Sequence, residues 1–189
     1  MPAAVLLAAG GSTRMGQPKA LLSLPDGRPL ARAWLDRLAE RCAPRLVVAG
    51  AVVAPLAALL GEDERLVVNP RWADTGPVDS LALAVRALPP AVTRAVVSPV
   101  DVPPPSSAAL ARLLAAPAPA VLCWQDTPGH PVCLGPAQLA ALREGPPPAE
   151  GLRALLKDAT CVQSDTPDAT LNLNRPEEWA AWITPGRGR

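Results

Sequence analysis

A glycine-rich loop that carries two cations follows the first apolar segment of the chain. Residues 10–19 read Gly-Gly-Ser-Thr-Arg-Met-Gly-Gln-Pro-Lys. Glycines let backbone N–H groups approach an anion without interference from a Cβ atom, and Arg14 and Lys19 add positive charge. The loop is therefore a candidate phosphate cradle. It departs from a P-loop, because Gln17 and Pro18 stand where that motif needs Lys and Ser or Thr, and its glycines do not fit G-x-G-x-x-G.

A single carboxylate follows another apolar segment. Asp101 comes directly after the run Ala95–Pro99 and Val100. In a parallel sheet, ligands bind beyond the carboxyl ends of the strands, so a side chain at this point is a candidate site residue. Two simpler interpretations stay open. Asp101 could cap the proline turn that begins at Pro103, and the glycine loop could be an ordinary turn with two solvated cations.

The elements that must position these residues alternate between short apolar runs and amphipathic helical patterns. One helical stripe joins Ala31, Trp34, Leu35, Leu38 and Cys42, and Ser106 or Ser107 is expected to cap a later helix. Such alternation predicts an α/β fold, a mostly parallel Rossmann-like sheet with helices on both faces, in one domain over residues 1–189. The expected strands are Ala3–Ala9, Arg45–Ala49, Leu66–Asn69, Ala95–Pro99, Ala120–Trp124, Pro131–Leu134, Cys161–Gln163 and Leu171–Asn174.

Composition excludes several functional classes. A net charge of +1 supplies no broad basic face, so no nucleic-acid partner is expected. The longest apolar stretch, residues 46–61, contains Pro55 and is shorter than the roughly 20 residues of a membrane span, so no membrane partner is expected. The N-terminus lacks the basic region of a signal peptide, which predicts a cytoplasmic protein. The four cysteines do not have zinc-site spacing and are expected to be small buried residues.

The run Leu7-Ala8-Ala9-Gly10-x-Ser12-x-Arg14-Met15-Gly16-x-Pro18-Lys19 resembles the signature of the MobA-like nucleotidyltransferases, most closely the molybdenum cofactor cytidylyltransferases. The resemblance implies the fold of the nucleotide-diphospho-sugar transferases and a loop that wraps a triphosphate. It assigns Arg14 to the leaving pyrophosphate and Lys19 to the α-phosphate, as catalytic cations. The nucleotide-binding residues that it implies at the end of the first strand are Leu7, Ala8, Ala9, Gly10, Gly11 and Ser12.

The same resemblance implies a metal site. Asp101 matches a strand-Asp-x-Pro motif whose Asp binds a catalytic Mg²⁺, and one carboxylate suffices where substrate phosphates complete the coordination. The segment from Leu171 to Glu177 resembles a [D/N]-x-[D/N]-T-P-E motif. Asn174 matches its second metal-facing position better than Asn172 does, although Asn174 could equally cap the following helix. Arg175 replaces the usual Thr.

Two further stretches resemble the base and acceptor sides of that family. Asn69-Pro70-x-Trp72 and the later Ser80-Leu81 resemble N-P-x-W…G…S-L, which implies nucleoside binding by Asn69 and Ser80; Ser80 could instead cap a helix. Gly129-His130-Pro131-Val132 resembles the G-H-P-V motif of the cytidylyltransferases, which implies that His130 binds the acceptor, although a lone histidine could equally be structural. A G-D-x-G-A-R-x-L-L motif is matched with Ala149 in place of its Asp.

The resemblance implies Mg²⁺-dependent transfer of a nucleoside monophosphate from an NTP, preferably CTP, to a phosphate-bearing acceptor, with molybdopterin expected and pyrophosphate released. It also allows contact with a molybdoenzyme or a chaperone. Three alternatives stay open. The acceptor could be a sugar phosphate or another metabolite, the base could be guanine, or the chain could be a nucleotide-binding accessory protein with weak catalysis, because the segments at Ala149 and Arg175 are altered.

Overall fold

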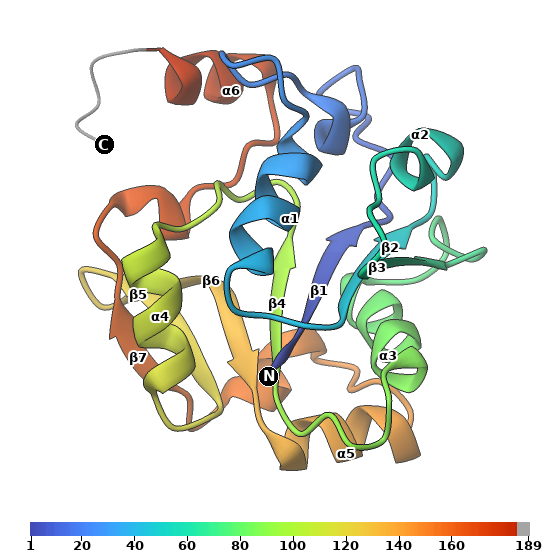
Figure 1. Ribbon diagram of the computed structural model, residues 1–189, viewed down its shortest axis with the longest axis vertical. Coiled ribbons are helices and arrows are strands. Elements are labelled where there is room, and N and C mark those ends of the chain that lie inside the picture. Colours follow the sequence, from blue (N-terminus) through green and yellow to red (C-terminus); the bar gives the residue numbers. More distant parts are fainter. Residues whose placement is uncertain (185–189) are drawn as a thin grey trace.

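A seven-stranded sheet forms the centre of the computed structural model, which describes residues 1–184 (Figure 1). The strand order is β3-β2-β1-β4-β6-β5-β7, and β6 runs antiparallel to both of its neighbours while the other neighbouring pairs are parallel. This confirms the predicted mostly parallel sheet. The strands are β1 (Ala3–Ala8), β2 (Arg45–Ala49), β3 (Glu64–Val68), β4 (Ala95–Pro99), β5 (Ala120–Trp124), β6 (Thr127–Leu134) and β7 (Thr160–Gln163).

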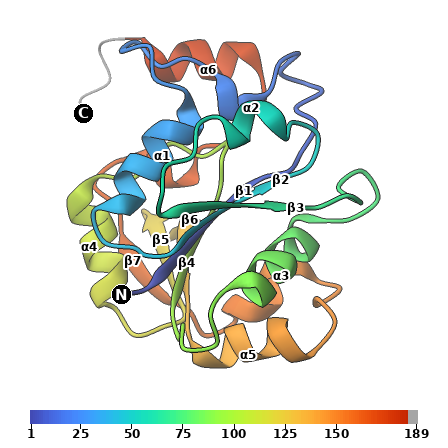
Figure 2. The same ribbon diagram turned by 45° about the vertical axis from the view of Figure 1, so that its right-hand side comes forward.

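Helices cover both faces of the sheet (Figure 2). The α-helices are α1 (Leu30–Ala39), α2 (Ala54–Ala57), α3 (Pro77–Ala87), α4 (Ser107–Ala115), α5 (Pro136–Glu144) and α6 (Pro176–Ile183), and the 3₁₀ helices are η1 (Lys19–Leu21), η2 (Gly151–Leu156) and η3 (Pro167–Thr170). Helices α1 and α6 pack in one apolar cluster, and α3 and α5 pack in another. Within residues 1–184, no helix combines the length and the apolar character that crossing a bilayer demands.

The alternation of β1 explains why this strand is apolar throughout. Ala4 and Leu6 are buried in the cluster under α1, whereas Ala3 and Val5 are buried in the cluster under α3. Successive side chains of a strand point to opposite faces, so a strand covered on both faces needs an apolar residue at every position. The loop after β1 therefore leaves from the middle of a rigid layer.

Beyond shifted strand ends, such as the start of β6 at Thr127 in place of Pro131, two larger features differ from the sequence-based expectation. Leu171–Asn174 is not a strand, because the segment crosses the end of β4, where Leu173 N–H donates to the carbonyl of Asp101 at 2.7 Å. Cys123 and Cys161 form a disulfide and are not both small buried thiols, whereas Cys42 and Cys133 are free and buried, as expected. The pairing of β5 with β7 brings these two Cα atoms within 5.8 Å, although 38 residues separate them in sequence.

A buried carboxylate links α1 to the edge strand β3. Glu64 accepts hydrogen bonds from Nη1 and Nη2 of Arg32 at 2.7 and 2.8 Å and from Gly61 N–H at 2.8 Å. The Arg32 guanidinium, helped by the Gly61 N–H, lowers the pKa of Glu64 from its usual 4.5 to about 2. The ionised carboxylate therefore stabilises the fold above pH 4.5, and this contribution is lost as the pH falls toward 2.

We expect Glu64→Gln to lower the free energy of unfolding at pH 7 by about 3 kcal/mol, since the variant removes the buried negative charge that the Arg32 and Arg45 guanidinium groups contact. Urea unfolding at a series of pH values measures this. The gap between wild type and variant should narrow as the pH falls from 4.5 toward 2, because in this range the Glu64 carboxylate takes up a proton in the unfolded chain but not in the folded one. Glu62→Gln, at an exposed neighbour, is the control. A gap that does not change with pH would contradict the assignment.

Candidate active site

The glycine loop leaves β1 at its carboxyl end and turns back through two residues of left-handed conformation. Ser12 has φ 52° and Gly16 has φ 74°, a value that favours glycine. The Ser12 hydroxyl accepts a hydrogen bond from the backbone N–H of Lys19 at 3.1 Å, and Met15 anchors the loop in the core with 4% of its surface exposed. These contacts fix the loop, so the backbone that carries the Lys19 side chain is held in place.

Three segments that are distant in sequence meet at the ammonium of Lys19. Its Nζ donates to Oδ2 of Asp101 at 2.7 Å and to Oδ1 of Asn174 at 2.6 Å. Arg14 Nη2 donates to the same Asn174 oxygen at 3.2 Å. The structure therefore brings together all four residues that the sequence assigned to phosphate and metal binding. A cation already sits between the two oxygens, which shows that both can serve one positive centre.

Backbone pairing positions Asp101. Leu7 and Pro99 are aligned in the parallel pairing of β1 with β4, and Val100 N–H donates to the Leu7 carbonyl at 2.9 Å. The next residue, Val102, is buried, and its carbonyl accepts from Nε1 of Trp34 at 2.7 Å. The chain before and after Asp101 is therefore held, and the carboxylate projects from the sheet edge. It does not act as the cap of the proline turn, since its recorded partner is Lys19.

Asn174 is held from the start of α6. Glu178 Oε2 accepts hydrogen bonds from the backbone N–H groups of Asn174 and Arg175, at 2.6 and 3.0 Å. This carboxylate does the capping, so the Asn174 side chain is free to face Lys19. Of the two asparagines considered, Asn174 joins the cation cluster and Asn172 lines a different cleft.

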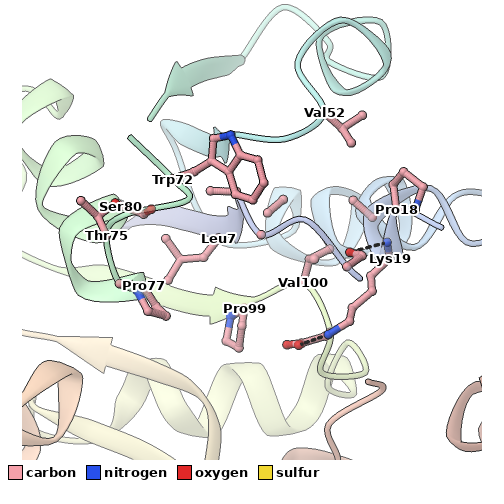
Figure 3. A pocket seen from close by; sticks show the side chains of 17 residues that line it. Leu7, Pro18, Lys19, Val52, Trp72, Thr75, Pro77, Ser80, Pro99 and Val100 are labelled. Atoms are coloured by element: carbon pink, nitrogen blue, oxygen red, sulfur yellow. Dashed lines mark hydrogen bonds and ion pairs between the residues drawn. The ribbon is translucent and has the colours of Figure 1, made fainter. Parts of the chain in front are cut away.

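A cleft of about 230 Å³, the nucleotide-side cleft, opens beside this cluster (Figure 3). Lys19 and Asp101 lie at its edge, and the predicted nucleotide-binding residues that line it are Leu7, Ala8, Ala9, Gly10, Ser12 and Ser80. Asn69 lies outside the lining. With 2% of its surface exposed, it donates from Nδ2 to the hydroxyls of Ser80 and Thr75, each at 3.0 Å, and so positions both.

Gly11 also lies outside the lining, because an indole covers it. A Cβ atom on Gly11 would come within 2.9 Å of the Trp72 ring, and one on Gly50 would come within 2.5 Å of the Trp72 Cβ. Trp72 itself lines the nucleotide-side cleft, between Leu7 and Val52 in Figure 3. The sequence placed Trp72 in a matched stretch but assigned it no role. Its contacts are with the ends of other strands, which local sequence does not show.

A second cleft of about 720 Å³ shares Asp101 with the first, and we name it the acceptor-side cleft because His130, which is predicted to bind the acceptor, lines it. It is lined by His130 of β6, by Asn172 and by the loop Pro147–Gly151. The two clefts share Leu7, Pro99 and Asp101 in their walls. Ligands in the two clefts would therefore meet at Asp101, beside Lys19.

His130 is held in a largely buried position. Burial lowers its pKa from 6.5, and the negative charge of Asp101 opposes that shift. The ring is therefore neutral at pH 7. Its Nδ1 is buried and has no hydrogen-bond partner within residues 1–184. The neighbouring position 129 requires glycine, because a Cβ atom there would lie 2.0 Å from the Ala169 carbonyl oxygen.

The donor set suits a metal ion that brings its own ligands. Within residues 1–184, no three His, Cys, Asp or Glu side chains converge as a metal cage. Asp101 and Asn174 provide two oxygens at one point, and Mg²⁺ is commonly held by one or two carboxylates together with substrate phosphates. With Arg14 and Lys19 beside them, the arrangement can bind phosphates and stabilise charge that develops on them.

Several known proteins are similar to this chain in sequence or in fold. The family model described as MobA-like NTP transferase domain matches residues 4–166. A protein of Xanthomonas euvesicatoria pv. vesicatoria named molybdenum cofactor guanylyltransferase is 34% identical over 188 residues, covering 95% of this chain and 93% of the relative. The crystal structure of Rv0371c from Mycobacterium tuberculosis superposes with a TM-score of 0.81 at 23% identity, covering 97% of this chain and 99% of that one. A nucleotidyl transferase from Methanothermobacter thermautotroptrophicus superposes with a TM-score of 0.77 at 25% identity, covering 97% and 96%.

Proposed function

The chain belongs to the MobA-like NTP transferase family, and on that premise we propose that it transfers a nucleoside monophosphate from an NTP to the phosphate of a molybdopterin-type acceptor. The observation that carries the proposal is that two clefts share Asp101, whose carboxylate contacts Lys19. A transferase with two substrates needs this layout, because the attacking and leaving groups must lie on opposite sides of one phosphorus. The name of the Xanthomonas relative supports molybdopterin as the acceptor.

The proposed reaction places the NTP in the nucleotide-side cleft and the acceptor in the acceptor-side cleft. An oxygen of the acceptor phosphate attacks the α-phosphorus, the bond to the β-phosphate oxygen breaks, and pyrophosphate leaves. Lys19 neutralises the α-phosphate and Arg14 the departing pyrophosphate. Asp101 and Asn174 would hold Mg²⁺, which supplies charge neutralisation on the phosphate oxygens. The neutral ring of His130, which lines the acceptor-side cleft, would contact the acceptor without adding charge.

The size of the side chain at position 9 and the name of the Xanthomonas relative favour different nucleotides as the donor. Ala9 lines the nucleotide-side cleft and is 9% exposed, and its methyl group occupies space that glycine would leave for a larger base. This favours CTP. The Xanthomonas relative is named a guanylyltransferase, which favours GTP as the second candidate. We take CTP as the preferred donor, since the argument from Ala9 concerns this chain's own cleft.

We expect the purified protein to use CTP better than GTP, and Ala9→Gly to narrow this preference. One methyl group changes kcat/KM for competing substrates by about 10- to 200-fold, so GTP is disfavoured and not excluded. Total activity should change little, since the cation cluster is untouched. The measurement is kcat/KM for both nucleotides in wild type and variant. A wild type that uses GTP better would establish the second candidate, and a ratio unchanged by Ala9→Gly would remove Ala9 from base selection.

Pyrophosphate release tests the whole proposal. The protein is incubated with Mg²⁺ and each of the four NTPs, with molybdopterin, with a panel of sugar phosphates, or without acceptor. The proposal requires release that depends on molybdopterin and on one preferred NTP. Release that depends on a sugar phosphate would point to a different acceptor. Tight nucleotide binding without release under any condition would point to an accessory nucleotide-binding protein.

A further inference from the structure

The Lys19 ammonium occupies the point at which the only two proposed metal ligands converge. Its Nζ lies 2.7 Å from Asp101 Oδ2 and 2.6 Å from Asn174 Oδ1. The side chain is 12% exposed, so the contact is largely shielded from solvent. Mg²⁺ binds oxygens at about 2.0–2.1 Å and would need the same two atoms. The ammonium and the metal ion are therefore alternatives at this position.

We infer that, before a nucleotide binds, Lys19 occupies the position that the metal ion requires between Asp101 and Asn174, so that the ion enters only together with the phosphates that draw Lys19 away. This rests on the proposed function in one respect, namely that a triphosphate is the ligand of the nucleotide-side cleft. It goes beyond that function because it sets an order of events. Metal alone binds weakly, and metal with nucleotide binds well.

The surroundings of Lys19 make this exchange local. Its backbone N–H is held by the Ser12 hydroxyl, so the flexible side chain can move while the loop stays in place. Lys19 also lines the nucleotide-side cleft, where the phosphates would lie. Arg14, at 3.2 Å from the Asn174 oxygen, is a second cation that would turn from this oxygen to the phosphates. When both cations leave, two oxygens become available to the metal ion.

The small number of protein ligands explains why a metal ion without a nucleotide does not displace Lys19. Asp101 is the only carboxylate in contact with Lys19 in the described part of the chain, and no cage of three His, Cys, Asp or Glu side chains is present in residues 1–184. One carboxylate and one amide oxygen are a poor site for an ion that arrives alone and must first displace an ammonium. A bound nucleotide removes both obstacles. Its phosphates add oxygen ligands for the metal ion, and they give Lys19 a new anionic partner.

Binding of Mn²⁺ in the absence of nucleotide tests the inference, with free Mn²⁺ measured by electron paramagnetic resonance. We expect Lys19→Met to bind Mn²⁺ about tenfold or more tightly than wild type, since it removes a charge that repels the ion. Asp101→Asn on the Lys19→Met background should abolish this gain. Lys157→Met, which removes the only other lysine, an exposed one, is the matched control and should bind as wild type. Equal or weaker binding by Lys19→Met would overturn the inference.

A measurement on the wild type keeps the test independent of how the variants fold. Because the chain has two lysines, ¹³Cε-lysine labelling yields two side-chain NMR signals, and Lys157→Met assigns them. Millimolar Mg²⁺ alone should leave the Lys19 signal in place, whereas Mg²⁺ with an α,β-methylene NTP should shift it. A shift caused by Mg²⁺ alone would overturn the inference. Neither experiment needs turnover, so absence of pyrophosphate release would count against the proposed function only.

Discussion

Asp101→Ala is expected to reduce turnover by at least about 10³-fold and to leave the fold intact. The side chain is 22% exposed and sits at the shared wall of the two clefts, where its recorded contact is with Lys19. The contacts that hold this part of the chain are made by backbone atoms, among them the Asp101 carbonyl that accepts from Leu173. Removal of the carboxylate therefore takes away charge for the metal ion without taking away packing.

Pyrophosphate release measures this loss, and thermal unfolding checks the fold. Asp101→Asn separates charge from shape, because the amide has the shape of the carboxylate without its charge. We expect its activity to fall nearly as far as that of Asp101→Ala. Asp74→Ala, at an exposed carboxylate in the neighbouring loop, is the control. Activity of Asp101→Ala within tenfold of wild type would contradict the assignment of Asp101 as a metal ligand.

The second large effect is expected for Lys19→Ala. We expect kcat to fall by about 10²- to 10³-fold while KM for the nucleotide changes by less than about fivefold. The reason is that charge on the transferred phosphate grows in the transition state, so a fixed cation there stabilises the transition state more than the ground state. Because the ion pair with Asp101 is largely shielded from solvent, thermal unfolding checks that the variant still folds.

Steady-state kinetics with saturating acceptor separate the two parameters, and Lys157→Ala is the matched control. A change confined to KM would place Lys19 in ground-state binding of the nucleotide. The same variant should bind Mn²⁺ more tightly in the absence of nucleotide, so loss of turnover and gain of metal affinity are expected together. No general damage to the site would produce that combination, because damage weakens both.

Local patterns in the sequence determined much of the fold. The apolar run Ala3–Ala9 predicted β1 to within one residue, and Ser106 caps α4 by accepting from Ala109 N–H at 3.0 Å, as the polar residue before a helical stripe indicates. Such features are local, since a buried strand must be apolar at every position and a helix needs an acceptor at its start. The glycine loop was equally visible, because its residue types are adjacent in sequence.

The exact ends of strands, and whether a short apolar segment is a strand at all, were harder to predict from the sequence. β3 begins at Glu64, before the expected Leu66, because Glu64 is buried by its ion pair with Arg32 although its residue type indicates exposure. Leu171–Asn174 looked like a strand, since Leu171 and Leu173 alternate with asparagines. The segment instead uses one backbone hydrogen bond at the end of β4. In each case a contact with a distant part of the chain overrode the local pattern.

The sequence by itself determined which residues could do chemistry, and only the tertiary structure decided which of them act together. Lys19 meets Asn174 across 155 positions, Trp72 covers Gly11, and Asn69 supports Ser80 from beneath the nucleotide-side cleft. These contacts arise because parallel strands from different parts of the chain end at one edge of the sheet. The identity of a residue is local, whereas its distance from a partner depends on the order of all strands between them. For that reason the sequence predicts Lys19 as a phosphate ligand but does not reveal its place between Asp101 and Asn174.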